Sequence, residues 1–370
     1  MIKHRQKLLK LIIISFLFIC IFSLKLPAQI NMYEIQELQQ KFIAAIKSND
    51  WQVAEQILDG YLNSENFNSH TAGNIVDQIM LYPQLLSIAE KMVVQSIKEN
   101  TIENLRQLGP EMANNQNQNL DYSRFYSRYA WILWKKGDFN RAQILMDSSL
   151  SFLKEPLKPD ATQLIRSGII RYFNHNRQNG WDDIKSALLL DTQIENKDPD
   201  YFQSIQKIVK DIYGKDEDVN KFLASYRKQN MGSLPDMSLT TLENEIIELK
   251  SLKDKVLFIN FFSPICGSCR QEIPNLKKVH DALKKEVVFL FILNNPGLKD
   301  PAIKLFKDNG YNKPLIATIN EKSAWDYILV EPTIWLVDKD GKIAFKHLGY
   351  RSGEEFVYQK EMMNLLRGLN

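Results

Sequence analysis

Apolar residues in the first half of the chain recur with a helical period. Tyr33, Ile35, Leu38, Phe42 and Ile46 fall near a spacing of 3.6 residues, which is typical of the buried stripe of a surface helix. Glycine and proline are sparse up to about residue 229, while Leu, Ile, Ala, Gln, Lys and Glu dominate. This pattern predicts an all-α helical-hairpin domain over residues 29–229.

Two stretches of this region are similar to each other. Residues 48–54 and 136–142 each combine a polar turn, an aromatic residue (Trp51 or Phe139) and, three residues later, a small alanine. We interpret both as turns of helical hairpins, and residues 179–184 as a fainter third copy. With residues 129–134 before it, the second stretch resembles a tetratricopeptide repeat, although no strict period is present. The region is either a scaffold that binds a protein partner or a helical domain whose Trp and Tyr fill its core.

After residue 229 the apolar period changes from that of helices to that of strands. Residues 229–235 form a plausible linker, and residues 230–370 are expected to form a second domain. The expected elements are a hairpin (237–240 with 245–249), strand 256–262, helix 266–285, strand 286–293, helix 301–309, a strand near Leu315, a short helix at 323–327, strands 333–337 and 343–347 joined by the turn 338–341, and helix 354–366. This order predicts a mixed central sheet with helices on both faces.

The N-terminus has the pattern of an export signal. A basic start is followed by an apolar run from Leu11 to Leu24 and a short polar exit that ends at Ala28. A run of about 14 residues is too short for a bilayer of about 30 Å, so residues 1–28 are interpreted as a signal peptide, with a retained anchor as the alternative. Cys20 does not indicate a lipid attachment site, because the preceding Ile19 is too bulky. We therefore expect a periplasmic or otherwise extracytoplasmic protein, and membrane association stays open.

Composition and charge exclude several classes. The 370 residues, 44% of them hydrophobic, indicate two globular domains rather than a disordered chain. The net charge is +3, but without residues 1–28 the chain has 42 basic and 44 acidic residues, a net charge of −2. A protein with a net charge this close to zero lacks the positive electrostatic field that attracts phosphate groups. Nucleic acid is therefore not an expected partner.

Removal of the signal peptide would leave two cysteines, Cys266 and Cys269. They follow a predicted buried strand and open a predicted helix. Unpaired N–H groups and the helix dipole stabilise a thiolate at Cys266, and Cys269 lies one turn further on, where it can resolve a mixed disulfide. Gly267 and Ser268 keep the intervening turn small. A strand, a CxxC motif and a helix in this order indicate thiol–disulfide exchange.

Two other uses of the cysteine pair are weaker. Zinc normally takes four ligands, and His280 and His347 are the only histidines that this domain could add. A structural disulfide between residues this close would barely restrain the unfolded chain. We expect neither a metal nor a cofactor.

Residues 234–370 resemble the thioredoxin superfamily and, within it, the TlpA/ResA-like exported thiol-disulfide oxidoreductases. The hairpin, the strand, the CxxC motif, the insert at 294–311 and the final hairpin follow the family order. Pro274 matches the family's helix-kinking proline. The resemblance also implies a redox-active Cys266–Cys269 disulfide and a cis-proline loop at residues 330–333, with a catalytic role for Pro332. An ordinary trans proline is the alternative at Pro332. The implied substrate-binding residues are Ile265, Gly267, Ser268, Val330 and Thr333.

Several residues depart from the family pattern. Ile265 replaces the usual Trp, Ser268 replaces the commoner Pro, and Asn260 stands where thioredoxin itself has a buried acid. Glu331 is unexpected beside the cis-proline. It either faces Cys266, where it would oppose the thiolate or accept the proton of the resolving thiol, or it is solvated. Glu272 and Arg270 are expected to be exposed residues of the helix.

These observations together predict an extracytoplasmic thiol-disulfide oxidoreductase, and the resemblance to reductases favours disulfide reduction. Its expected partners are protein substrates with disulfides, a membrane-bound thiol reductant as electron donor, and a protein partner of the helical domain. A peroxiredoxin-like peroxidase is one alternative, because Ser263 and Cys266 match part of that motif, although Ile259 stands where its proline belongs. The other alternative is a helical scaffold with a redox-inert appendage.

Overall fold

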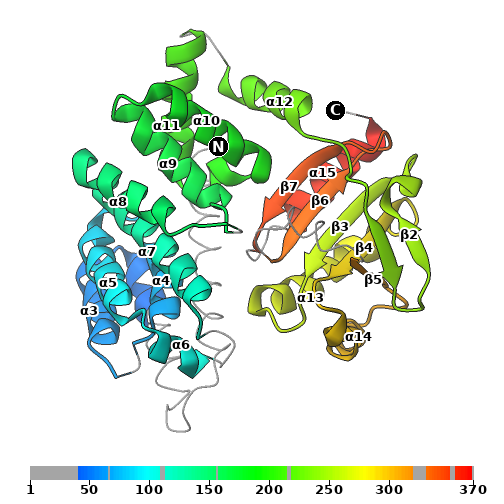
Figure 1. Cartoon of the computed structure of the whole chain (residues 1–370), viewed down its shortest axis with the longest axis horizontal. Coiled ribbons are helices and arrows are strands. Elements are labelled where there is room, and N and C mark those ends of the chain that lie inside the picture. Colours follow the sequence, from blue (N-terminus) through cyan, green and yellow to red (C-terminus); the bar gives the residue numbers. More distant parts are fainter. Residues whose placement is uncertain are drawn as a thin grey trace. The chain divides into compact units, whose positions relative to one another are not determined.

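The computed structural model describes residues 41–65, 67–108, 113–155, 157–214, 218–319, 331–350 and 355–368 (Figure 1). The predicted signal peptide, with Cys20, lies outside these residues, as do the predicted helix at 323–327 and Val330. The contacts divide the chain into two compact units. One contains the residues up to Ile184 together with Asp198–Ser204, and the other contains Lys185–Lys197 together with the residues from Ile205 onward.

The first unit is helical. Its helices, some of which continue into the second unit, are α3 (Trp51–Leu62), α4 (Ser69–Ile79), α5 (Leu86–Glu99), α6 (Ile102–Leu108), α7 (Asn115–Lys135), α8 (Phe139–Ser151), α9 (Ala161–Phe173), α10 (Arg177–Leu190) and α11 (Pro199–Tyr213). Side chains of Asp or Asn accept backbone N–H groups in the first turns of α3, α4, α7, α8 and α9. Trp131 is fully buried, and Trp134 stacks on it with ring centroids 4.6 Å apart.

The two similar stretches form the same local structure. Asn49 and Gly137 both have a positive φ, 58° and 85°, and the next residue of each, Asp50 or Asp138, caps the following helix. The fainter third stretch does not form such a turn, because residues 179–184 lie inside α10. The residue with a positive φ that precedes α10 is His175, two residues before the helix begins. The third turn was therefore placed too late in the sequence.

The second unit is built on a seven-stranded sheet in the order β2-β1-β5-β4-β3-β6-β7. The strands are β1 (Ser238–Thr241), β2 (Ile246–Glu248), β3 (Val256–Phe262), β4 (Val287–Leu293), β5 (Leu315–Ile319), β6 (Thr333–Val337) and β7 (Ile343–Leu348). The central strands β3, β4 and β5 are parallel, whereas β1, β2, β6 and β7 pair antiparallel. The unit also contains α12 (Val219–Asn230), α13 (Gly267–Leu283), α14 (Lys299–Asp308) and α15 (Glu355–Arg367).

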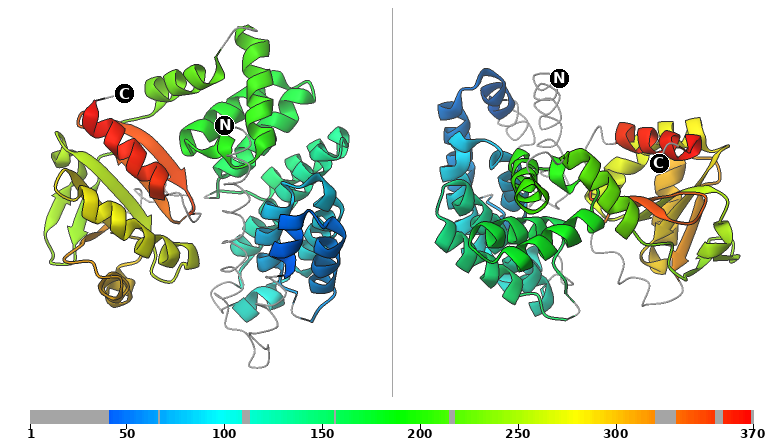
Figure 2. Two further views of the ribbon diagram at one scale, coloured as in Figure 1. Left: turned by 180° about the vertical axis from the view of Figure 1, so that it is seen from behind. Right: turned by 90° about the horizontal axis from the view of Figure 1, so that it is seen from above.

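Both faces of this sheet are covered. Every residue of β3 is buried, and its side chains alternate between two hydrophobic clusters. Phe258 and Phe262 face a cluster with apolar residues of α13, α14 and α15, and Figure 2 shows α13 and α15 on that side. Leu257 and Phe261 face a cluster against which Leu189 of α10 packs. A helical region followed by a thioredoxin-like mixed sheet with helices on both faces confirms the predicted fold class.

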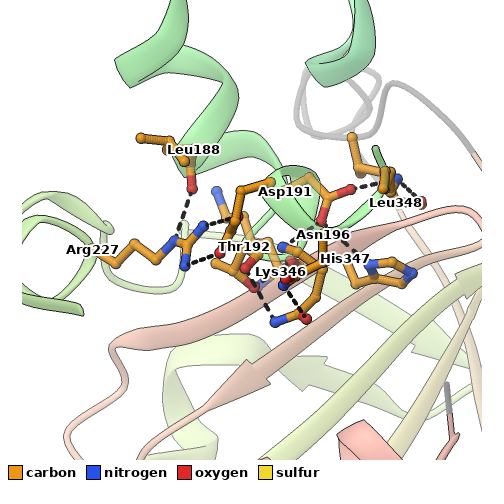
Figure 3. Close-up of polar contacts among 11 residues, drawn as sticks. Leu188, Asp191, Thr192, Asn196, Arg227, Lys346, His347 and Leu348 are labelled. Carbon is orange, nitrogen blue, oxygen red and sulfur yellow. Dashed lines mark hydrogen bonds and ion pairs between the residues drawn. The ribbon is translucent and has the colours of Figure 1, made fainter. Parts of the chain in front are cut away.

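The second unit includes residues from the region that the sequence assigned to the helical domain. Residues 185–197 and 205–229 group with the sheet, whereas the predicted boundary follows residue 229. Thr192 provides one reason, because its N–H group donates to the carbonyl of Lys346 in edge strand β7 at 2.8 Å (Figure 3). Within the part of the chain that the structure describes, no helix combines the length and apolar character needed to span a bilayer.

Candidate dithiol site

Cys266 lies where the chain leaves the sheet and begins a helix. Strand β3 ends at Phe262, and Cys266 occupies the N-cap position of α13 with extended backbone angles. The residue is partly exposed, and its sulfur lies 3.1 Å from Ser268 Oγ. Hydrogen bonds from Cys269, Ser268 and the backbone N–H groups of the first turn outweigh burial and lower the pKa of Cys266 to about 6. A large fraction of this thiol is therefore ionised at neutral pH.

Cys269 has the opposite environment. It is fully buried in the first turn of α13, and both cysteines are free thiols in this structure. Burial raises the pKa of Cys269 far above its usual range, and the neighbouring Cys266 and Glu272 raise it further. The two thiols are therefore unequal, since one is accessible and acidic while the other is buried and protonated.

The loop before β6 lies against Cys266. The peptide bond between Glu331 and Pro332 is cis, as the resemblance implied, and Pro332 is buried. The thiol of Cys266 donates a hydrogen bond to the Glu331 carbonyl at 3.7 Å. Folding thus brings together two segments 65 residues apart in the sequence.

The Glu331 side chain is half-buried. Burial and the negative charge of Cys266 raise the pKa of Glu331 to about 7, although a hydrogen bond with Asn294 acts in the other direction. Of the two interpretations of Glu331, its partial burial and the effect of the Cys266 charge on its pKa favour the one in which the side chain faces Cys266.

Glu272 is not an exposed helix residue, and this prediction was wrong. The side chain is fully buried, and Asn260 Nδ2 of β3 donates to Glu272 Oε2 at 2.6 Å. The reason is helical spacing, because Glu272 follows the buried Cys269 by three residues and shares its inward face. That spacing could have revealed it from the sequence. Arg270 is exposed, as predicted.

The other predicted substrate-binding residues differ in exposure. The Ile265 side chain is 72% exposed beside Cys266, whereas Gly267 and Ser268 are half-buried. Thr333 is fully buried, so its side chain lies beneath any surface that a protein substrate could touch. Among the described residues, no group of three or more His, Cys, Asp or Glu is arranged to hold a metal ion.

Comparison with known proteins finds similar proteins for the C-terminal part of the chain, which contains the two cysteines. Residues 232–346 match the model of the AhpC/TSA family. The thiol-disulfide oxidoreductase ResA of Bacillus thuringiensis is 31% identical over 137 residues, which cover 36% of this chain and 79% of the relative. The thioredoxin-like protein YneN of Bacillus subtilis is 27% identical over 146 residues, which cover 37% of this chain and 85% of the relative.

Among solved structures, a thioredoxin family thiol:disulfide interchange protein from Chlorobium tepidum is similar, with 22% sequence identity and a TM-score of 0.32. The similarity covers 37% of this chain and 97% of that protein. The identity to ResA, which extends over most of that relative's length, establishes the family. Through its C-terminal part, the chain belongs to the ResA family of thiol-disulfide oxidoreductases and is a thioredoxin-like protein-disulfide oxidoreductase.

Proposed function

We propose that this protein is an extracytoplasmic disulfide reductase in which Cys266 attacks and Cys269 resolves. The observation that carries the proposal is the inequality of the two thiols. Cys266 is accessible with its pKa lowered to about 6, whereas Cys269 is fully buried with a raised pKa. Attack on a substrate needs an exposed thiolate, and resolution needs a thiol that stays protonated and shielded until the mixed disulfide has formed.

The first step is attack of the Cys266 thiolate on one sulfur of a substrate disulfide. A bond forms between Cys266 Sγ and that sulfur, the substrate S–S bond breaks, and the other substrate sulfur leaves as a thiolate that takes up a proton. The Glu331 carbonyl beside Cys266 provides a backbone acceptor for an extended substrate segment. The exposed Ile265 offers an apolar contact at the same place.

The second step is attack of Cys269 on Cys266 Sγ. Cys269 loses its proton, the mixed disulfide breaks, and the second substrate sulfur leaves as a thiolate. The substrate has then gained two electrons and the protein holds a Cys266–Cys269 disulfide. Glu331 is a suitable proton acceptor for this step, because its pKa of about 7 lets it exchange a proton near neutral pH. A membrane-bound thiol reductant is the proposed source of the two electrons that restore the dithiol.

Reduction is proposed rather than peroxide chemistry because a resolving thiol lies one helical turn from the attacking one. The extracytoplasmic location rests on the basic, apolar and polar segments of residues 1–28. The alternative of a helical scaffold with a redox-inert domain is disfavoured, because such a domain would not need this pair of unequal thiols.

Reduction of insulin disulfides by the full chain tests the proposal. We expect Cys266→Ser to abolish reduction, because no attacking thiolate remains. Cys269→Ser should form mixed disulfides that persist, since nothing displaces the bound substrate. Mass spectrometry of the trapped adducts gives the readout. Unimpaired reduction by Cys266→Ser, or a lack of adducts with Cys269→Ser, would contradict the assigned roles.

A further inference from the structure

A short segment between α10 and α11 holds the edge strand β7 of the sheet. Thr192 donates both its backbone N–H group, at 2.8 Å, and its Oγ1 hydroxyl, at 2.7 Å, to the carbonyl of Lys346. In return the Lys346 N–H group donates to Thr192 Oγ1 at 3.3 Å. Figure 3 shows Thr192 and Lys346 with these contacts as dashed lines. At this sheet edge the backbone N–H and carbonyl groups of Lys346 are thus paired within the protein itself.

Lys197 extends this attachment to the end of β7. Its Nζ donates to the carbonyl of Leu348 at 2.9 Å and pairs with Asp191 Oδ2 at 2.6 Å. The other oxygen of Asp191 lies 3.2 Å from Nδ1 of His347. The Asp191 side chain is fully buried and that of Lys197 is 15% exposed. A buried carboxylate therefore holds the lysine ammonium group in place against the strand.

The end of β7 is joined to the cis-proline loop. Leu348 lies opposite Thr333 in the pairing of β6 with β7, and the next residue, Gly349, donates its N–H group to the carbonyl of Pro332 at 2.8 Å. Pro332 follows Glu331, whose carbonyl accepts the Cys266 thiol at 3.7 Å. A continuous series of contacts therefore connects Lys197 to the attacking sulfur.

We propose that Lys197 is a positioning residue: through Leu348 and Pro332 it fixes where Glu331 lies relative to Cys266. The contacts of Lys197 are those of the protein without substrate. The inference rests on the proposed function only where it implies that Lys197 affects the reduction of a substrate. Lys197 lies outside residues 232–346, the range that matches the family model. A segment from outside the matched domain thus adjusts the dithiol site.

The direction of the effect follows from the contacts. The Glu331 carbonyl accepts a hydrogen bond from the protonated Cys266 thiol, and the thiolate has no proton to donate to it. This interaction favours the protonated thiol. A loop that is held less firmly spends less time in contact with Cys266, so loss of the lysine contact lowers the pKa of Cys266.

The test compares Lys197→Met with the wild type in the reduced full chain. Methionine keeps an apolar stem of similar length and removes the ammonium group. The readout is the pH dependence of Cys266 alkylation by iodoacetamide, followed by mass spectrometry, because buried Cys269 reacts far more slowly. We expect the midpoint to fall by about 0.5 pH unit, which gives about threefold faster alkylation below the midpoint. Lys197→Arg, which keeps the positive charge, should restore most of the wild-type profile.

Lys228→Met is the matched control, because Lys228 is an exposed lysine in the same unit and its loss should leave the midpoint unchanged. If Lys197→Met does not fold, Thr192→Val, which removes the hydroxyl contacts to Lys346, should shift the midpoint in the same direction. An unchanged midpoint in the folded variant, even with reduced stability, would show that Lys197 is merely structural and overturn the inference. Insulin reduction is measured separately: if the wild type fails to reduce insulin, the proposed function fails and the alkylation comparison still decides the role of Lys197.

Discussion

At the level of single residues, Cys266 and Glu331 compete for negative charge in a small space. Each raises the free energy of ionising the other, so the two groups titrate as a coupled pair. The hydrogen bonds of the α13 N-terminus favour the thiolate, and the pKa of Cys266 is lowered to about 6. Burial and that thiolate raise the pKa of Glu331 to about 7. Near neutral pH an ionised Cys266 thus lies beside a Glu331 carboxyl group that is about half protonated.

Removal of the Cys266 thiolate should make Glu331 more acidic. In Cys266→Ser the repulsion from the thiolate is lost while the size of the side chain is nearly kept, so the Glu331 pKa should fall below the wild-type value of about 7. The chemical shift of the Glu331 carboxyl carbon, titrated by NMR in the reduced protein, measures this change. The control is Glu243→Gln, which removes an exposed carboxylate from the same unit and should leave the Glu331 pKa unchanged. A Glu331 pKa that stays the same or rises in Cys266→Ser would refute the assigned repulsion.

At the level of secondary structure elements, the contact between α9 and α10 in the first unit depends on two glycines. A Cβ atom on Gly180 of α10 would lie 2.6 Å from the backbone nitrogen of Tyr172 and 2.7 Å from the carbonyl oxygen of Gly168, both in α9. These are backbone atoms, so no side-chain rotation can relieve the clash. The glycines therefore set the distance between α9 and α10.

Gly180→Ala should destabilise the protein although alanine is the better helix former. The helices must separate, and overpacking of this kind costs about 1–3 kcal/mol, more than the gain of about 1 kcal/mol in helix propensity. Urea unfolding measures the difference. Gly60→Ala in α3 is the matched control, because a Cβ atom there has no neighbour within 4 Å, and it should stabilise the protein slightly. Equal effects of the two substitutions would contradict this account.

At the level of the whole molecule, the second unit depends on a contact between distant parts of the sequence. Asp191 and His347 are 156 residues apart and both are buried. Burial works to raise the pKa of Asp191, but Lys197 and His347 outweigh it and hold the pKa well below its usual range. A carboxyl group whose pKa is lower in the folded than in the unfolded state stabilises the fold above the unfolded pKa.

Asp191→Asn should therefore lower stability at neutral pH, by about 3–5 kcal/mol, the usual effect of removing one partner of a buried ion pair. The difference from the wild type should shrink as the pH falls below about 4, because the wild-type carboxylate is then protonated on unfolding. Urea unfolding at neutral and at acidic pH provides the measurement. In the control, Asp236→Asn, an exposed surface pair with Lys250 is lost, and stability should change by less than about 1 kcal/mol. If the stability difference between Asp191→Asn and the wild type does not depend on pH, the ionised Asp191 carboxylate is not the cause of the lost stability.

Local patterns predicted the elements of the second unit well. Strand β3, the dithiol at the start of α13 and the final hairpin of β6 and β7 occur where the sequence placed them. Each is determined by residues close in the sequence: a continuous apolar run, a turn, or a change of period. The pair Cys266 and Cys269 could be recognised for the same reason, since one helical turn brings both thiols to the N-terminus of α13.

The sequence by itself therefore determined the order of the described elements, the fold class and the position of the cysteine pair. Only the tertiary structure decided that Glu272 is buried against Asn260, that the charge of Cys266 raises the pKa of Glu331, and that Lys197 contacts the end of β7 across 151 residues of sequence. The physical reason is range. Periodicity and capping act over a few residues, whereas burial and charge pairing depend on which surfaces meet when the chain folds, and a charged residue carries no local mark of the partner it will find.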